Sequence, residues 1–292
     1  MHKYLRAIGF SKINGKKELN ELITQTIREA TDKLFHTVGE EVFAEFSKDY
    51  AENIGIAVRG TFDEQNRFLC DYYFPYCIGT DVSSEEDVSI ERHAAKESYA
   101  GVCDDLKVGI SLIFYLQNVI PYLEIKDEGL LPVRGTTLTL SALSCQGMVM
   151  MPIIKNDRSK DKIKQATRTR NELIAAARKG DEDAIESLTL EDMDTYTEIS
   201  RRIHKEDIFS LVDTYFMPYG VECDNYSILG EILECSLVTN KVTNEEVYLM
   251  TILCNDLQFD LCINKQELYG EPAVGRRFKG TIWMQGYINY PA

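Results

Sequence analysis

The sequence predicts an α+β protein in three parts. These are an N-terminal antiparallel sheet with a flanking helix, a helical connector, and a small antiparallel β-barrel at the C-terminal end. Three observations predict this order. Helical periodicity near the start changes to a period of two, and a block of uneven charge then separates the two ends of the chain. Alternation of apolar and polar residues returns over the last 70 residues. Strands joined by short loops favour antiparallel pairing, and a helix beside such a sheet is typical of the α+β class.

The first predicted element is an amphipathic helix over residues 19–34, after a turn at Asn14-Gly15. Its apolar side chains recur at helical spacing and form one stripe about 140° wide. Such a stripe indicates a helix that covers one face of a sheet. The residues of the stripe are Leu19, Leu22, Ile23, Thr26, Ile27, Ala30 and Leu34.

The period then changes to two, which predicts strands. Val, Ile, Phe and Tyr dominate these runs, and short loops rich in Asp, Gly and Pro separate most of them. Residues 63–66 join two of the runs as a hairpin loop. The predicted strands of this part cover residues 43–46, 54–62, 67–77, 98–103, 107–116, 136–144 and 148–153.

A change of charge marks the connector. Residues 155–179 carry nine basic against three acidic side chains, and residues 181–213 carry eleven acidic against three basic ones. Both blocks have helical periodicity, and Gly180-Asp181 between them fits the end of one helix and the N-cap of the next. Charge pairing between the blocks, or plain solvation, explains the basic block better than nucleic-acid binding does.

Strand periodicity returns in the last part of the chain. Four or five short strands with few helices predict a small barrel, similar to an oligonucleotide-binding barrel. We therefore expect an α+β domain over 1–154, a helical connector over 155–222 and a barrel-like domain over 223–292. The strands predicted for the barrel are 227–238, 247–254, 258–263 and 276–288.

Composition and charge exclude several classes of protein. The chain is 44% hydrophobic and 27% charged, which is enough to bury a core in each half. Its net charge is −15, with the acidic residues spread along the chain, so nucleic acid and anionic membranes are unlikely partners. The longest apolar run, 108–116, is far shorter than the roughly 20 residues of a membrane span. Without a signal peptide either, we expect a cytoplasmic protein.

The eight cysteines predict neither disulfides nor a metal site. No two of them form a C-x-x-C motif, and no His lies at zinc-finger spacing from any of them. Most lie inside apolar or alternating runs. We expect reduced thiols that pack as small hydrophobic side chains.

Five segments resemble a family of uncharacterised bacterial proteins. The family is a domain of unknown function found mainly in anaerobic Gram-positive bacteria, and the resemblance covers most of the chain. It implies a cytoplasmic bacterial protein and supplies no activity, cofactor or catalytic residue. The segments are MHKYLRAIGFSKI (1–13), GIAVRGTFDEQNRF (55–68), KESYAGVCDD (96–105), DTYTEISRRIHKEDIFSLVDTYFMPYGVECDNYSILGEI (194–232) and GRRFKGTIWMQGYI (275–288).

The sequence lacks the common catalytic motifs. There is no phosphate-binding loop, no G-x-G-x-x-G, no H-E-x-x-H and no G-x-S-x-G. These absences disfavour an NTPase, a dinucleotide enzyme, a zincin and an α/β-hydrolase. The sequence thus favours a non-catalytic protein and predicts no cofactor.

One cluster of ionisable residues supports an alternative, catalytic hypothesis. Glu91 and His93 share a face if they lie on one strand, and Glu97, Asp104 and Asp105 follow closely. Carboxylates beside an imidazole can hold a divalent metal or pair a base with the acid that orients it. The cluster therefore predicts a metal-assisted hydrolase as the alternative function. A solvated turn with ion pairs to neighbouring basic residues explains the same pattern.

The last predicted strand carries the candidate binding residues Arg276, Arg277, Phe278, Trp283 and Tyr287. Phe278 and Trp283 are separated by an odd number of positions, so on a regular strand they face opposite sides. We expect one ring in the core and the other on an exposed contact surface.

The main hypothesis is a non-catalytic cytoplasmic protein that binds another protein or a small ligand. Binding would use the aromatic surface of the barrel and the domain junction, and a homo-oligomer is compatible with it. A weaker alternative is a single-stranded nucleic-acid binder, in which the same aromatic rings stack on bases.

Overall fold

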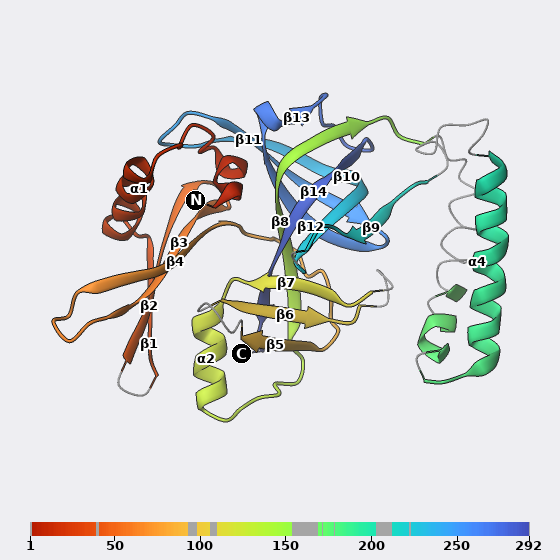
Figure 1. Cartoon of the computed structure of the whole chain (residues 1–292), viewed down its shortest axis with the longest axis horizontal. Coiled ribbons are helices and arrows are strands. Elements are labelled where there is room, and N and C mark those ends of the chain that lie inside the picture. The colour runs from red at the N-terminus through yellow and green to blue at the C-terminus, as the bar shows by residue number, and fades with distance from the viewer. Residues whose placement is uncertain are drawn as a thin grey trace.

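The computed structural model describes residues 2–38, 41–92, 98–105, 110–153, 169–170, 172–177, 179–202, 212–221 and 223–291. Within these residues the chain is α+β, as predicted. It forms a four-stranded N-terminal sheet and a ten-stranded second sheet, part of which closes into a barrel (Figure 1).

The N-terminal part is an antiparallel sheet with one helix against it. The strand order is β1-β2-β3-β4, and neighbours in the sheet are also neighbours in the chain. Helix α1 packs on β2 and β3, where the Thr26 hydroxyl lies 2.8 Å from the Tyr50 hydroxyl. The elements are η1 (Lys3–Ile8), α1 (Lys16–Arg28), β1 (Asp32–Val38), β2 (Glu41–Ala51), β3 (Ile54–Phe62) and β4 (Phe68–Cys77).

The predicted end of the first helix is wrong. Helix α1 ends at Arg28, and residues 32–38 form β1, which pairs antiparallel with β2. Tertiary pairing therefore overrides a helical stripe that continues through Leu34. The hairpin loop at 63–66 is confirmed, because the Asp63 carboxylate accepts the backbone N–H groups of Gln65 and Arg67 across it.

A second layer follows the N-terminal sheet and leads into the barrel. Strand β6 pairs antiparallel with β5 on one side and with β7 on the other, and β7 pairs parallel with β14. The segments predicted as two strands over 136–153 form the single strand β8, and the sequence pattern missed α2. The elements are β5 (Val88–Arg92), β6 (Tyr99–Cys103), β7 (Leu112–Leu116), α2 (Val119–Asp127) and β8 (Thr137–Met150).

The barrel has five strands that pair in a closed cycle, β8–β12–β11–β10–β14–β8. The predicted barrel is confirmed. The division into domains at 154 and 222 stays a prediction, but the pairing places β8, upstream of residue 154, inside the barrel. Without β8, the edges of β12 and β14 would lack the partner that closes the cycle. The other strands are β10 (Asn225–Thr239), β11 (Glu246–Cys254), β12 (Leu257–Asn264) and β14 (Arg277–Asn289).

The connectivity matches an oligonucleotide-binding barrel whose closing strand comes first. In that barrel the first three strands form a meander, the fourth returns beside the first, and the fifth closes in parallel with the third. Here β10, β11 and β12 form the meander, and β14 returns beside β10. Strand β8 closes the barrel in parallel with β12. The fold is therefore barrel-like in the predicted sense, with a permuted strand order.

The connector leaves the barrel and returns to it at one point. Helix α4 (Glu182–Arg202), which agrees with the predicted acidic helix, stands apart from the barrel in Figure 1. Residues 172–177 of the basic block are helical, while most of that block and residues 203–211 lie outside the described residues. We call the connector segment between Met151 and Val212 the excursion. Buried Arg277 donates to the carbonyl oxygens of these two residues, both at 3.0 Å, and so joins the two ends of the excursion. Beyond it, β9 (Tyr215–Pro218) pairs with β10.

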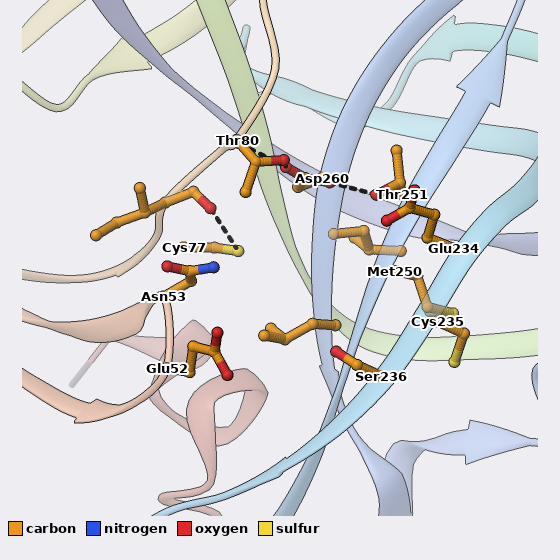
Figure 2. Close-up of a pocket in the computed structure, with 13 residues that line it drawn as sticks. Glu52, Asn53, Cys77, Thr80, Glu234, Cys235, Ser236, Met250, Thr251 and Asp260 are labelled. Atoms are coloured by element: carbon orange, nitrogen blue, oxygen red, sulfur yellow. Dashed lines mark hydrogen bonds between the residues drawn. The ribbon is translucent and has the colours of Figure 1, made fainter.

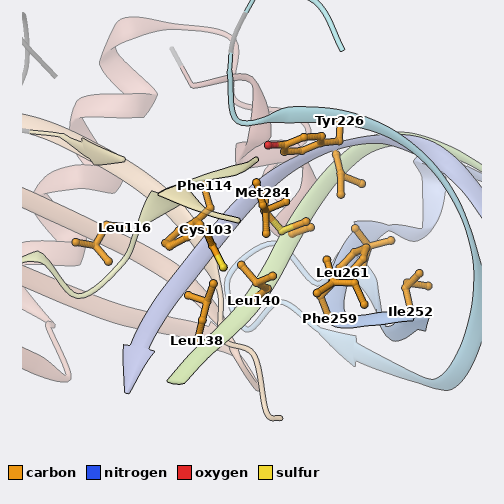
Figure 3. Packing of buried hydrophobic residues seen from close by; sticks show 14 of the residues in the cluster. Cys103, Phe114, Leu116, Leu138, Leu140, Tyr226, Ile252, Phe259, Leu261 and Met284 are labelled. Atoms are coloured by element: carbon orange, nitrogen blue, oxygen red, sulfur yellow. The ribbon is translucent and has the colours of Figure 1, made fainter. Parts of the chain in front are cut away.

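The barrel interior and the β5–β7 layer share one hydrophobic core (Figure 3). The side chains labelled in Figure 3 come from seven strands, β6, β7, β8, β10, β11, β12 and β14, so the second layer is continuous with the barrel. The residues labelled in Figure 3 are Cys103, Phe114, Leu116, Leu138, Leu140, Tyr226, Ile252, Phe259, Leu261 and Met284.

A buried arginine joins the N-terminal sheet to the second layer. Arg59, on β3, is fully buried, and its Nε donates to the carboxylate of Glu45. Its other two nitrogens donate to the Tyr115 hydroxyl, at 2.9 Å, and to the carbonyl oxygen of Gln117. Its guanidinium also lies 4.5 Å from the centre of the Phe74 ring. The planar guanidinium group thus donates hydrogen bonds in three directions at once, which the ammonium group of a Lys cannot reproduce.

Two glutamine side chains extend this junction. The amide of Gln285, on β14, accepts from the N–H of Cys77 at 3.2 Å and donates to the carbonyl oxygen of Pro75 at 2.8 Å. Gln117 donates to the Cys77 carbonyl and to the Gln285 amide oxygen, both at 2.8 Å. The end of β4 therefore has side-chain amides where a neighbouring strand would otherwise bond. This fixes the position of β4 against the barrel.

All eight cysteines are free thiols, and four are buried. Burial raises the pKa of the Cys103 thiol to about 11 and that of Cys254 to about 12. These thiols stay protonated at neutral pH, when an ordinary thiol with a pKa of about 8.5 already begins to ionise.

Replacing Arg59 should strongly destabilise the fold. In Arg59→Met, the Glu45 carboxylate stays buried without its cation, which costs about 3–5 kcal/mol of unfolding free energy. The control is Arg67→Met, which breaks the exposed pair with Asp63 and should cost less than about 1 kcal/mol. Urea denaturation measures both. Equal losses in the two variants would contradict the structural role of Arg59.

Alkaline pH should lower stability through the buried thiols. Because the folded pKa of Cys254 is raised above its unfolded value, the stabilisation is complete below pH of about 8.5 and is lost as the pH rises towards about 12. Cys254→Ala should flatten the decline of unfolding free energy with pH by up to about 1.4 kcal/mol per pH unit in this window. Denaturation curves at pH 8 to 11 measure the slope. An unchanged slope would show that the thiol titrates normally.

Candidate functional site

The outer face of the β10–β12 meander carries a lateral row of polar side chains. Glu234 pairs with Thr251, and Thr251 pairs with Asp260, so the three residues lie side by side across the strands. A β-bulge between Ile232 and Glu234 produces this row. Ile232 points into the barrel core, and without the bulge Glu234 would do the same.

The N-terminal sheet forms the opposite wall. The turn between β2 and β3 contributes Glu52 and Asn53, and Asn53 adopts the left-handed conformation that this turn needs. The segment after β4 contributes Thr80, whose N–H and hydroxyl both donate to one oxygen of Asp260, at 2.7 and 2.8 Å. The other oxygen of Asp260 accepts from the Thr251 hydroxyl at 2.7 Å.

These two walls enclose a pocket of about 200 Å³, which we call the junction pocket (Figure 2). Figure 2 shows Glu52 and Asn53 on one side of it and Glu234 and Ser236 on the other. The residues that line the pocket are Glu52, Asn53, Cys77, Ile78, Thr80, Glu234, Cys235, Ser236, Leu249, Met250, Thr251, Asp260 and Leu261.

The lining of the junction pocket is acidic. It includes the carboxylates of Glu52, Glu234 and Asp260, and none of the described residues that line it is a Lys, Arg or His. A concave surface with charge of one sign concentrates the opposite charge. The pocket therefore repels phosphate groups and attracts cations.

Residues 5–286 match a protein family described as "Domain of unknown function, E. rectale Gene description (DUF3881)". The chain belongs to the DUF3881 family. This membership confirms the predicted resemblance to a domain of unknown function, and it covers the N-terminal sheet, the excursion and the barrel together. No curated protein and no solved structure matches the chain. No helix in the described part of this family member is long and apolar enough to cross a membrane.

The candidate binding residues on β14 do not form one surface. Phe278 and Trp283 do face opposite sides, but both are buried, so the expectation of an exposed ring is wrong. The reason is that the N-terminal segment covers the outer face of β14. Tyr4 stacks on Trp283 with ring centres 5.3 Å apart, and the Trp283 Nε1 donates to Asp224 at 2.7 Å.

The remaining candidates on this strand have separate environments. Arg277 is buried at the base of the excursion, while Arg276 donates to the carbonyl oxygen of Glu271 at 2.6 Å. Tyr287 is 44% exposed. Whether any of them contacts a partner stays a prediction.

The described residues of the acidic cluster have different environments. Glu91 lies exposed on β5, and the Asp104 carboxylate accepts from the Ser111 hydroxyl. Asp105 is buried and accepts from the Ser84 hydroxyl at 2.6 Å. His93 and Glu97 lie outside the described residues. The hydrolase hypothesis therefore stays a prediction, although within the described residues no three His, Cys, Asp or Glu side chains could hold a metal.

Sequence reasoning missed the junction pocket. Its walls come from segments far apart in the chain, and the bulge at Ile232/Glu234 breaks the alternation that would place Glu234. One usable signal was Asp260, the only charged residue in the mostly apolar strand LQFDLCIN.

Trp283 and Tyr287 should differ in their effect on stability. Trp283→Ala removes a buried ring and its hydrogen bond to Asp224, and we expect a loss of about 3–5 kcal/mol of unfolding free energy. Tyr287→Ala, on the same strand but half exposed, should cost no more than about 1 kcal/mol. Chemical denaturation compares them. A loss below 1 kcal/mol for Trp283→Ala would mean that the ring is free to act as a surface contact.

Proposed function

We propose that the protein is a non-catalytic binding protein whose ligand site is the junction pocket. One observation carries the proposal: the polar row on the outer face of β10–β12 faces a second wall from the N-terminal sheet, and the two enclose a pocket. Sites at domain interfaces with a few convergent polar groups are the usual form of a ligand site. The proposal keeps the predicted binding site at the domain junction but assigns it to the junction pocket instead of the aromatic rings.

The strand topology also supports a ligand site on the outer face of β11 and β12. Oligonucleotide-binding barrels use the face of their second and third strands for ligands, and these strands correspond to β11 and β12 here. Thr251 and Asp260 lie on that face. Because a shared fold does not fix the ligand, the topology supports only the position of the site.

The size of the pocket favours a small ligand. A volume of about 200 Å³ is below the range of about 300–1,000 Å³ that drug-sized ligands occupy. The hydrogen bonds from Thr80 to Asp260 tie the two walls together, so the pocket is formed before the ligand arrives. The acidic lining weighs against the nucleic-acid alternative, since phosphates dominate that affinity.

We further propose that the protein is bacterial and resides in the cytoplasm. Eight free cysteines fit a reducing compartment, and the family description refers to E. rectale.

Filling the pocket should abolish ligand binding. The test screens amines, carboxylates, nucleotides and sugars by thermal shift, since a ligand at 100 times its Kd adds about 2.7 kcal/mol to apparent stability. We expect at least one class to raise the Tm of the wild type, and Ser236→Tyr to remove the shift because Ser236 lines the pocket. Thr239→Tyr, exposed on the same strand outside the pocket, should keep it.

The unliganded Tm of each variant controls for folding. A shift that survives Ser236→Tyr, or a wild type that responds to none of the classes, would overturn the proposal.

A further inference from the structure

We propose that strand β1 is a dimerisation edge, through which two copies of this chain pair antiparallel and join their four-stranded N-terminal sheets into one continuous sheet. The inference is independent of the junction pocket. It rests on three observations: an open strand edge, exposed apolar side chains on both faces of that strand, and a strand sequence that is complementary to itself.

The outer edge of β1 has no partner strand in the described chain. Strand β2 pairs with the other edge over all seven residues, Asp32–Val38, without a shift of register. No backbone group of residues 32–37 bonds to any further described segment. An edge of this kind presents a row of N–H and C=O groups with which another strand can pair. The backbone therefore specifies an extended strand as the partner.

The other strand edges in the part of the chain that the structure describes are interrupted or short. Strand β4, at the opposite edge of the same sheet, has an irregular register beside Arg59 and Gly60, and the amides of Gln117 and Gln285 bond to the backbone of Cys77 near its end. Strands β5, β9 and β13 (Leu268–Tyr269) have five, four and two residues. Bulges and short edges are devices that prevent unwanted strand pairing. Strand β1 has neither, and it contains no proline.

Apolar side chains flank the open edge on both faces of the sheet. Leu34 lies beside Glu45, on the face that carries Arg59, and is 40% exposed. Phe35 lies on the opposite face and is 50% exposed, with its ring centre 5.9 Å from that of Phe46. A second strand beside β1 would cover part of both side chains. Burial of this apolar surface would add to the free energy of the backbone hydrogen bonds.

The sequence of β1 is complementary to itself when two copies run antiparallel. A two-fold axis at Leu34 places this side chain opposite its own copy. On the same face, Asp32 then lies opposite His36 of the second copy, an acid beside an imidazole. On the other face, Lys33 lies opposite Phe35, where an ammonium group can contact the face of the ring. Apolar pairs and acid–base pairs in opposite positions stabilise antiparallel strands.

Neighbouring registers lose this complementarity. Residues opposite each other in an antiparallel sheet point to the same side, so the axis has to pass through a residue and not between two. An axis at Lys33 would bring two ammonium groups together, and an axis at Phe35 would leave Lys33 opposite Thr37. A strand that matches itself in one register favours a second copy of this chain over a strand of a different protein.

The length of the edge indicates a weak, reversible dimer. Seven residues of antiparallel strand extend about 24 Å. One strand pair of this length belongs to the small end of specific interfaces, which bury about 1,200–2,000 Å² in total. The net charge of −15 on each copy also opposes association, and physiological salt screens this repulsion. Because each copy uses the same edge, the pairing closes with two copies.

Sedimentation velocity at physiological ionic strength measures the association. We expect the wild type to change from the 33.3 kDa monomer to a dimer as its concentration rises through the micromolar range. Leu34→Lys places two like charges at the axis and should weaken the dimer by about tenfold or more. The matched control is Leu69→Lys, which makes the same change at a 50% exposed Leu of β4 and should dimerise as the wild type does. The Tm of each variant controls for folding.

Disulfide cross-linking tests the register. The two exposed native thiols are first removed in a Cys70→Ser/Cys223→Ser background. In this background Leu34→Cys should link two copies, with oxidised glutathione accepting the two electrons of the thiols, because residues opposite each other have Cβ atoms about 4.5–5.5 Å apart. Thr37→Cys, exposed on the same strand, would lie six residues or about 20 Å from its own copy and should not link.

Three outcomes would overturn the inference. A wild type that stays monomeric through the micromolar range would leave the edge of β1 to a strand of another protein. A dimer that is equally stable in Leu34→Lys and Leu69→Lys would lie on a different surface. Cross-linking of Thr37→Cys in place of Leu34→Cys would contradict the self-complementary register. None of these variants changes a residue that lines the junction pocket, so ligand binding tests the proposed function separately.

Discussion

The position of the N-terminal sheet depends on one buried arginine. Arg59 reaches from β3 to an acid on β2, a hydroxyl on β7 and the carbonyl that follows β7. A buried charge tolerates little displacement, because every lost hydrogen bond leaves a polar group without water. The glutamine amides of Gln117 and Gln285 then fix the end of β4. Thr80 follows directly and reaches Asp260, so the pocket inherits its shape from this junction.

Local patterns in the sequence predicted most of the fold. Period-two runs predicted most strands of both sheets but not β1, β5 or β9. The acidic block predicted α4, because amphipathicity, like alternation, is set by burial on one side. Non-local pairing decided what the patterns could not. Residues 32–38 leave the helical stripe to pair with β2, and β8 joins a barrel formed mostly by strands that follow it in the chain after residue 222.

The candidate site was harder to predict than the fold. The exposed ring expected on β14 is covered by Tyr4, a residue more than 270 positions away in the chain. The alternation of side chains along one strand shows which face a ring lies on, but not whether a distant segment packs on that face. The junction pocket depends on a bulge that reverses the direction of Glu234 and on a wall supplied by another sheet. The family match leaves the function open, and the candidate site is inferred from this geometry.

The central claim is that polar contacts make the N-terminal sheet and the barrel one cooperative unit. Native-state hydrogen exchange tests it most directly, because it reports the opening free energy of each region separately. The account predicts that the amides of Val58 in β3 and Leu261 in β12 exchange with the same opening free energy, equal to that of global unfolding. Exchange of Val58 at a clearly lower free energy, with Leu261 still protected, would show that the sheet opens independently and would contradict a preformed pocket.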